Sequence, residues 1–308
     1  MRVGVESGAR LHAGFYYAGG GWRVKWGGLG FYVERPRFLV EAWACDKPSF
    51  EGFGDFESEA RRALEVIGVQ GVCFKVVEPL PAHVGLGSTT QTLLSVLTAG
   101  CAVAGSSRDP VEMARIIGRG RVSGVGSLLF KYGGFIMDAG SPDPGGPRTL
   151  VRLDIPESWR FIILTPHVGR GLSENMEKAL LEEPWKPGVK PALYMSRGAL
   201  RLALGVARGD LEEALEGLRE VQTGTGLYFR EFQGGVYRGD LGAIVAEASK
   251  DRIILAQSSW GPTLYTIALE GEAEGLARKL SLLVRELGFK ASITVSKPRN
   301  RGASVTFE

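Results

Sequence analysis

The chain has 308 residues, of which 44% are hydrophobic and 23% are charged, a balance typical of a globular protein with real cores. The formal net charge is only +3 and no run of five like charges occurs, so a phosphate-bearing metabolite explains the basic lean without a nucleic-acid partner. No stretch approaches the roughly 20 apolar residues of a membrane-spanning helix, and the first residues have no apolar signal core. We therefore expect a cytoplasmic protein with neither a membrane nor a nucleic-acid partner.

The three cysteines are Cys45, Cys73 and Cys101, and no pair of them has the CxxC spacing. A sparse, odd count argues against a disulfide framework and against a structural zinc site. Each cysteine lies in an apolar stretch, which predicts three buried thiols that act as small hydrophobic side chains.

The first third of the chain alternates β-branched and aromatic runs with glycine turns, which is typical of strands in a mixed or antiparallel sheet. Five short strands are expected there, at residues 3–7, 11–17, 22–28, 30–36 and 37–44. The next elements expected are an amphipathic helix at 56–67, a strand at 72–77, an apolar helix at 89–103 and a helix opened by Asp109 and Pro110.

A strand at 160–166 looks like the start of a second domain, and the proline-glycine stretch at 141–147 is a weaker candidate for a boundary. The later elements expected are helices at 173–182, 191–207 and 209–222, a hinge-like Thr-Gly-Thr-Gly at 223–226, strands at 252–258 and 262–269, a helix at 272–288 and a strand at 290–296. The strand–helix–strand ending suggests an α+β sandwich with helices on one face.

The segment from Pro81 to Gln91 joins a predicted strand to a predicted helix. Gly85 and Gly87 let the backbone turn so that successive N–H groups point into one concavity, and the start of the following helix adds partial positive charge. Ser88 or Thr89 is expected to cap that helix. These features predict a phosphate site on the turn, the alternative being glycines that serve only the geometry of the turn.

All three histidines precede a glycine by two residues, in His12-Ala-Gly, His83-Val-Gly and His167-Val-Gly. Each of these tripeptides is a turn signal beside a predicted strand. The pattern suggests that the three side chains converge on one polar cleft, whereas a lone histidine is usually a surface or satisfied core residue.

Five motifs are spread from Ala9 to Tyr265: ARLHAGF, WGGLGFYVERP, GLGSTTQ, GRGRVSGVGSLLFKYGGFIMDAG and QSSWGPTLY. The third, within P-x-H-x-G-L-G-S-T-T-Q, resembles the central motif of the GHMP kinase superfamily. Together the five resemble one family within it, the β-ribofuranosylaminobenzene 5′-phosphate synthases. The resemblance implies an α+β, GHMP-kinase-like two-domain fold. It places a domain similar to ribosomal protein S5 domain 2, with the glycine-rich phosphate loop, at 1–157 and a ferredoxin-like domain at 158–308.

Two departures from an ordinary GHMP kinase stand out. Such kinases often carry S-G-x-D after the glycine loop, whereas the corresponding run here is Ser123-Gly124-Val125-Gly126. The third superfamily motif is normally a run of glycines, and Gln257 to Pro262, with Trp260, takes its place. Since a positioned general base contributes roughly 10²–10⁴-fold in rate, losing the acid makes phosphorylation of a hydroxyl doubtful.

The resemblance implies an archaeal enzyme of methanopterin biosynthesis that joins 4-aminobenzoate to phosphoribosyl pyrophosphate and releases CO2 and pyrophosphate. It also implies a homodimer. Whether the aromatic acceptor is 4-aminobenzoate or 4-hydroxybenzoate stays open. Two other functions are weighed: an ATP-dependent small-molecule kinase of the same superfamily, and a non-catalytic metabolite-binding protein that kept only the fold.

The hypothetical site combines cations, the glycine turn and an aromatic pocket. The catalytic candidates are Arg10, His12, His83, Arg119 and Arg121. The phosphate-binding candidates are Gly85, Leu86, Gly87, Ser88, Thr89, Thr90 and Lys131. The candidates for the aromatic pocket are Gln257, Ser258, Ser259, Trp260, His167 and Arg170. The competing interpretations are a solvated surface for the cations and core packing for the tryptophan.

Asp138 is the candidate ligand for Mg²⁺, because it ends the apolar run Gly134 to Met137 and because magnesium commonly uses one or two carboxylates plus substrate phosphates. The alternative is an ordinary residue at the end of a strand.

Overall fold

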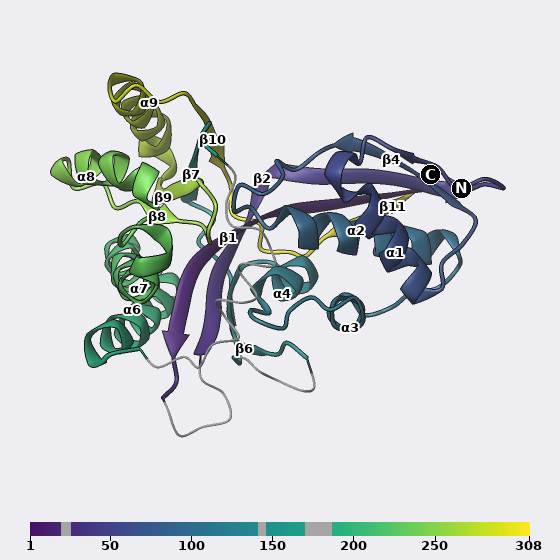
Figure 1. Ribbon diagram of the computed structural model, residues 1–308, viewed down its shortest axis with the longest axis horizontal. Coiled ribbons are helices and arrows are strands. Elements are labelled where there is room, and N and C mark those ends of the chain that lie inside the picture. The colour runs from purple at the N-terminus through teal and green to yellow at the C-terminus, as the bar shows by residue number, and fades with distance from the viewer. Residues whose placement is uncertain (20–25, 141–145, 170–186) are drawn as a thin grey trace.

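The computed structural model describes residues 1–19, 26–140, 146–169 and 187–308. In chain order the elements are β1 (Arg2–Tyr17), β2 (Trp26–Ala44), β3 (Phe50–Glu51), α1 (Glu57–Ile67), β4 (Val72–Glu78), α2 (Ser88–Val103), α3 (Pro110–Ile116), α4 (Val125–Tyr132), β5 (Phe135–Asp138), β6 (Thr149–Leu153), β7 (Trp159–Pro166), α6 (Val189–Arg208), α7 (Leu211–Gln233), α8 (Gly242–Lys250), β8 (Ala256–Gln257), β9 (Leu264–Leu269), α9 (Glu270–Glu286), β10 (Ala291–Ser296) and β11 (Ser304–Phe307). They form two lobes, and β1 and β2 extend from one lobe to the helices of the other (Figure 1).

The first sheet has the order β11-β1-β2-β4-β3, with β5 paired to β2 and β6 paired to β5. Helix α2 packs against β1 and β2, and α1 packs against α2. The prediction of separate short strands is wrong, because β1 and β2 are each continuous and pair antiparallel from Arg2 opposite Trp43 to Tyr17 opposite Trp26. The glycine signals mark register shifts inside β1 rather than turns, and part of the strand expected at 22–28 lies outside the described residues.

The second sheet has the order β10-β7-β9-β8, and α9 packs against β7, β9 and β10. Strand β7 is apolar on both faces. Phe161 and Ile163 join the core shared with the first sheet, whereas Ile162 and Leu164 join a second core with α8 and α9. Burial on both faces explains why this strand has a continuous apolar run rather than an alternating pattern. The fold class is the α+β, two-part fold that the resemblance implies.

The hinge predicted at 223–226 is wrong, because these residues lie inside α7. A Cβ atom on Gly224 would lie 2.6 Å from the backbone nitrogen of Met195 in α6. The glycine therefore permits close approach of two helix backbones. The helix expected at 173–182 lies outside the described residues.

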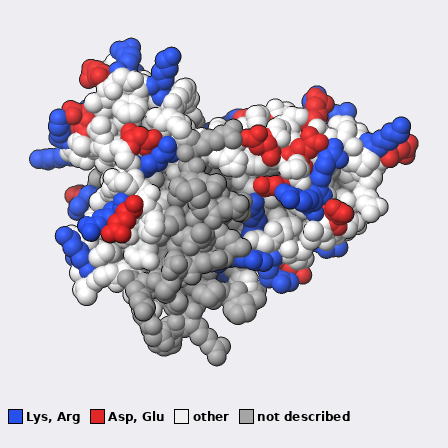
Figure 2. All heavy atoms as spheres, in the orientation of Figure 1, with Lys and Arg blue, Asp and Glu red and all other residues white. Residues whose placement is uncertain are grey.

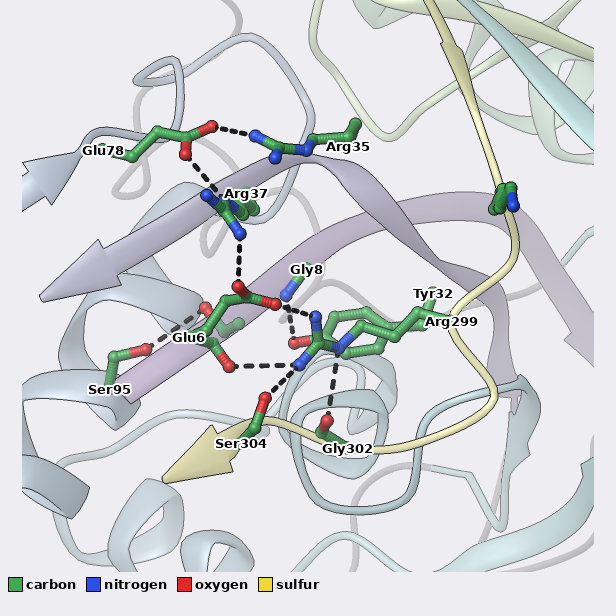
Figure 3. A network of polar contacts seen from close by, with 12 residues as sticks. Glu6, Gly8, Tyr32, Arg35, Arg37, Glu78, Ser95, Arg299, Gly302 and Ser304 are labelled. Carbon is green, nitrogen blue, oxygen red and sulfur yellow. Dashed lines mark hydrogen bonds and ion pairs between the residues drawn. The ribbon is translucent and has the colours of Figure 1, made fainter. Parts of the chain in front are cut away.

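The second sheet begins at β7, close to the predicted boundary at 157/158, but the chain returns to the first sheet through β11, which pairs with β1. Arg299 holds this returning segment. Its side chain is 1% exposed, and it donates to both Glu6 and Ser304, as Figure 3 shows. Glu6 also pairs with Arg37, which pairs with Glu78. The C-terminal strand is thus fixed to the N-terminal sheet by a buried cation.

Two of the three cysteines do not follow the prediction. Cys45 and Cys73 form a disulfide with a Cα–Cα distance of 5.9 Å, whereas Cys101 is a buried free thiol as expected. Strands β2 and β4 are neighbours and Trp43 lies opposite Cys73, which brings Cys45 close to Cys73 although the two cysteines are 28 positions apart. Spacing along the chain carries no sign of this contact between strands.

Most of the other predicted helices and strands begin and end within a few residues of the predicted ranges. The strand expected at 252–258 shortens to β8, and the helix expected at 209–222 continues to Gln233 as α7. The elements β3, α4, β5, β6, α8 and β11 were not predicted. Within the described ranges, no helix is long and apolar enough to cross a membrane. Basic and acidic side chains are interspersed over the face in Figure 2, in keeping with the low net charge.

Candidate active site

The glycine turn before α2 has the backbone that an anion cradle requires. Gly85 and Gly87 have φ values of 96° and 74°, and Gly87 is the residue that precedes the first turn of α2. No side chain caps that helix, so the prediction that Ser88 or Thr89 does so is wrong. The Ser88 hydroxyl instead accepts from the backbone N–H of His83, at 3.2 Å. The N–H groups at the start of α2 are therefore left uncapped by the protein's own side chains, as a phosphate site requires.

The segment Gln257 to Pro262 packs directly on the glycine turn although it lies more than 160 residues later in the chain. The Ser258 hydroxyl donates to the carbonyl of Gly85 at 2.6 Å and accepts from the backbone N–H of His12 at 2.9 Å. A side chain on Gly261 would overlap the backbone of Val84. Three of the five motifs thus meet at one buried serine.

Arg10 lies across the glycine turn. Its backbone N–H donates to the carbonyl of Leu86 at 3.0 Å, and its guanidinium Nη1 donates to the carbonyl of Gly85 at 3.3 Å. A Cβ atom on Gly87 would lie 3.1 Å from the Arg10 Nε. A cation is therefore held beside the uncapped start of α2, where both favour a bound phosphate.

His12 is 5% exposed and its ring has a defined hydrogen-bonding pattern. The backbone N–H of Gly14 donates to Nδ1 at 3.2 Å, and Nε2 lies 3.4 Å from the hydroxyl of Ser123. Burial, together with the nearby charge of Arg10, holds the pKa of His12 well below its usual value. The ring is therefore neutral, with its proton on Nε2 directed at Ser123.

Asp138 is 2% exposed, and its carboxylate accepts hydrogen bonds from β2, from the segment before α4 and from Gly140 just beyond β5. Oδ1 accepts from the backbone N–H groups of Gly28 and Gly140 at 2.9 and 3.0 Å. Oδ2 accepts from the N–H of Gly124 at 2.8 Å and from the hydroxyl of Ser123 at 3.2 Å. Burial raises the pKa of Asp138 to about 6 although these hydrogen bonds oppose the shift.

This environment does not fit a magnesium ligand. Both carboxylate oxygens already accept two hydrogen bonds from the protein, and the side chain has almost no access to solvent. No cluster of three His, Cys, Asp or Glu side chains occurs among the residues that the structure describes. Asp138 instead links Gly28 of the WGGLGFYVERP motif to Ser123 and Gly124 at the start of α4.

The three predicted cations of the GRGRVSG region have separate surroundings. Arg119 pairs with Glu59 of α1 at 3.2 Å and is largely buried. Arg121 is exposed on the loop that leads to Ser123. Lys131 lies at the last turn of α4 and pairs with Asp109, which caps α3. The structure thus brings Arg10 to the turn and does not bring Lys131 there.

The predicted aromatic pocket is mostly occupied by the protein's own contacts. Gln257 is 5% exposed and its side chain bonds the backbones of Ser259 and Arg238. Trp260 packs edge-on against Phe229 of α7, with ring centroids 4.8 Å apart. Ser259 has a positive φ of 56°, which forms the turn before the tryptophan. These residues build the wall behind His12 and Phe15, whose rings lie 4.9 Å apart.

The three histidines have different neighbours. His12 is buried at the site, whereas His83 is exposed with its ring 5.4 Å from that of Phe56. His167 is exposed and bonds Ser292 at the edge of the second sheet. No contact among the three rings occurs in the described part of the chain, and Arg170 lies outside it.

No protein-family model matches the chain. Three curated proteins are similar to it over almost its whole length, and all are named beta-ribofuranosylphenol 5′-phosphate synthase. The protein of Methanothermobacter thermautotrophicus is 29% identical over 90% of each chain. Those of Archaeoglobus fulgidus and Methanocaldococcus jannaschii are 28% identical over 91% of each chain and 24% identical over 98% of this chain and 99% of the relative. The resemblance to this group of synthases is confirmed.

Solved structures are similar over the whole chain as well. Homoserine kinase from Cytophaga hutchinsonii has a TM-score of 0.70 at 18% identity, covering 99% of this chain and 97% of its own. Mevalonate diphosphate decarboxylase from Staphylococcus aureus has a TM-score of 0.68 at 12% identity, covering 99% of this chain and 98% of its own. The chain has the GHMP kinase fold. At identities this low, the similarity shows a shared fold and does not show a shared reaction.

Within the GHMP fold, the position of the frequent kinase acid is Gly126. A Cβ atom there would lie 3.3 Å from the Thr90 side chain in the first turn of α2. The carbonyl of Gly126 accepts from Gln91 at 3.0 Å, and Gln91 in turn accepts from Tyr32 at 2.9 Å. The starts of α2 and α4 are thus joined by hydrogen bonds without a carboxylate between them.

Two residues that hold the candidate site together, Gln222 and Ser123, were not singled out from the sequence. Gln222 of α7 donates to the carbonyls of Ala13 and Gln257 at 2.8 and 3.1 Å, which ties the second lobe to β1. Ser123 lies between His12 and Asp138. Ser123 stands in a motif that was recognised, but only the missing acid of that motif was interpreted. Gln222 stands in no motif, so nothing in the sequence marked it.

Proposed function

We propose that this protein is a β-ribofuranosylaminobenzene 5′-phosphate synthase of methanopterin biosynthesis. In this reaction a para-substituted benzoic acid condenses with phosphoribosyl pyrophosphate, and CO2 and pyrophosphate leave. The observation that carries the proposal is an uncapped glycine turn with Arg10 across it, in a GHMP fold that has glycine at the position of the kinase acid. The similarity to the named synthases along the chain supports it.

The proposed reaction makes separate demands on the site at the leaving group and at the aromatic acid. Ribose C1 becomes electrophilic as pyrophosphate leaves, and a cation beside helix N–H groups stabilises the departing negative charge. The ring carbon that bears the carboxylate attacks C1, and loss of CO2 restores aromaticity. Attack by ring carbon also requires that the aromatic acid be oriented. Phe15, Phe229 and Trp260 form a buried aromatic cluster beside His12, which would support that acid from behind.

The acceptor is part of the proposal. The family resemblance implies 4-aminobenzoate and leaves 4-hydroxybenzoate open, and the name of the relatives contains phenol, which corresponds to 4-hydroxybenzoate. Both acids have the same carboxylate and the same ring, and they differ only in the substituent opposite the carboxylate. We propose that both are tested as substrates.

Mg²⁺ belongs to the proposal as a companion of the substrate's phosphates, because the surroundings of Asp138 do not fit a protein-held ion. When bound, the ion would neutralise part of the charge of pyrophosphate. A homodimer and an archaeal source are proposed on the basis of the resemblance alone. A cytoplasmic location is proposed because no stretch of the sequence approaches the length of a membrane-spanning helix.

The test is release of labelled CO2 from carboxyl-labelled acceptor, incubated with phosphoribosyl pyrophosphate and Mg²⁺. We expect release that requires phosphoribosyl pyrophosphate and that does not respond to ATP. A parallel incubation with ATP tests the alternative, a small-molecule kinase that uses the same glycine turn. Stabilisation by ATP without any release of CO2 would contradict the synthase and favour that kinase.

A further inference from the structure

Ser123 is placed between one buried base and one buried histidine. Its hydroxyl lies 3.2 Å from Oδ2 of Asp138 and 3.4 Å from Nε2 of His12. Asp138 and His12 are almost fully buried, whereas Ser123 is only partly buried. Of these three side chains, the serine is therefore the one that a substrate in the site can reach.

The hydrogen bonds that link His12, Ser123 and Asp138 run in one direction. Because Gly14 donates to His12 Nδ1, the imidazole proton is on Nε2 and is directed at the oxygen of Ser123. The serine's own proton is then left for Asp138, which accepts it at Oδ2. The remaining lone pair of the serine oxygen can accept one more proton donor. Among the residues that the structure describes, the competing donor is the N–H of Val125, at a long 3.4 Å.

We propose that Ser123 and Asp138 form a proton relay that takes the proton from the para substituent of the aromatic substrate. In this relay Ser123 is the catalytic residue, and Asp138 acts through it as a positioning residue and final proton acceptor. This inference rests on the proposed function. It assigns to this pair the acid–base work for which ordinary GHMP kinases often use the acid that is missing at Gly126.

The step balances for 4-hydroxybenzoate. The phenolic O–H bond breaks, its proton passes to the Ser123 oxygen, and the serine's proton passes to Asp138. The electron pair that is released forms a ring C=O, and the para carbon bonds to ribose C1 as the C1–O bond to pyrophosphate breaks. The C–CO2⁻ bond then breaks, its electrons restore the aromatic ring, and the proton returns to the oxygen along the same path.

The electrostatics of Asp138 suit a proton acceptor. Burial raises its pKa to about 6, so the group is ionised at neutral pH yet more basic than an ordinary carboxylate. Two titratable groups of β1 face it: Tyr16, whose hydroxyl donates to the Asp138 carbonyl at 2.8 Å, and His12 across Ser123. The pKa of Tyr16 is raised to about 12 and that of His12 is lowered, so neither changes charge near pH 6 to 8. The contacts from β2 and α4 are backbone N–H groups of Gly28 and Gly124.

The two acceptors give a sharp test. The amino group of 4-aminobenzoate can donate electrons to the ring without losing its proton in the same step, so it depends less on a base. In Ser123→Ala we expect kcat to fall roughly 100-fold or more with 4-hydroxybenzoate, but less than about tenfold with 4-aminobenzoate. The wild-type kcat with 4-hydroxybenzoate is expected to decline below pH 6, and this inflection is expected to be absent in Ser123→Ala.

The matched control is Ser127→Ala, in the first turn of α4 just after Ser123, whose hydroxyl donates to the carbonyl of Gly124 and not to Asp138. Equal losses with both acceptors in Ser123→Ala, or an unchanged pH profile, would overturn the relay while leaving the synthase intact. Use of 4-aminobenzoate alone by the wild type would also overturn it. Absence of CO2 release with either acid in the wild type would instead reject the proposed function, and the relay with it.

Discussion

At the scale of single residues, burial changes the pKa of the Asp138 carboxyl group. A pKa raised from 3.8 to about 6 means that the folded protein binds the proton more tightly than the unfolded chain does. The folded state is therefore favoured by this group at low pH, and that advantage is lost as the pH rises through about 6.

Asp138→Asn isolates this effect on stability. We expect the wild type to lose roughly 2 kcal/mol of unfolding free energy relative to Asp138→Asn between pH 4 and pH 7. Other titrating groups, His12 among them, cancel in the difference between the two proteins. Urea unfolding at several pH values measures it, and parallel stability curves for the two proteins would contradict a raised pKa.

The residues of the candidate site were predicted from the sequence with uneven success. The motifs correctly identified the segments that meet, since Arg10, His12, Gly85 and Ser258 are in contact. They did not distinguish side chains that face a ligand from those that hold the segments together, such as Gln257. That distinction depends on partners such as Gln222, which comes from a distant helix and lies in no motif.

At the scale of elements, glycine has two opposite effects in the helices of the second lobe. Gly224 in α7 lies against the backbone of α6, and a Cβ atom there would be 2.6 Å from the nitrogen of Met195 and 2.8 Å from the carbonyl oxygen of Pro191. Gly275 in α9 has nothing within 4 Å of the same position. Glycine has the same low helix propensity at both positions, so the sequence alone does not reveal that Gly224 lies at a contact between helices. For that reason Gly224 was interpreted as part of a hinge.

Alanine at these two positions is expected to change stability in opposite directions. Gly224→Ala should destabilise the protein by roughly 1–3 kcal/mol, because the added methyl group forces α6 and α7 apart. Gly275→Ala should stabilise it by up to about 1 kcal/mol, because alanine favours an exposed helix. Thermal unfolding of both variants checks this, and a loss of stability in Gly275→Ala as large as that in Gly224→Ala would refute the packing argument.

At the scale of the whole molecule, the two lobes are not two separate lengths of chain. The shared core contains Phe161 and Ile163 of the second sheet together with Leu11 and Phe31 of the first. The start of the second sheet at β7 could be inferred from the apolar run of that strand. The return of the last residues to the first sheet could not be inferred, because β11 is short and exposed and its anchor is the buried Arg299 rather than an apolar pattern.

Arg299 is therefore expected to contribute to the stability of a sheet that lies almost 300 residues away in the chain. In Arg299→Met, the Glu6 carboxylate keeps Arg37 but loses its buried partner, and the carbonyls of Gly302 and Glu6 lose a donor. We expect a loss of roughly 2–4 kcal/mol in unfolding free energy, together with faster hydrogen exchange of the β1 amides that face β11.

Arg35→Met is the matched control. Arg35 is about half exposed and pairs only at the surface with Glu78, so its loss should cost less than about 1 kcal/mol. Equal stability of the two variants, with unchanged exchange in β1, would mean that pairing with β11 holds the C-terminal segment without the buried cation.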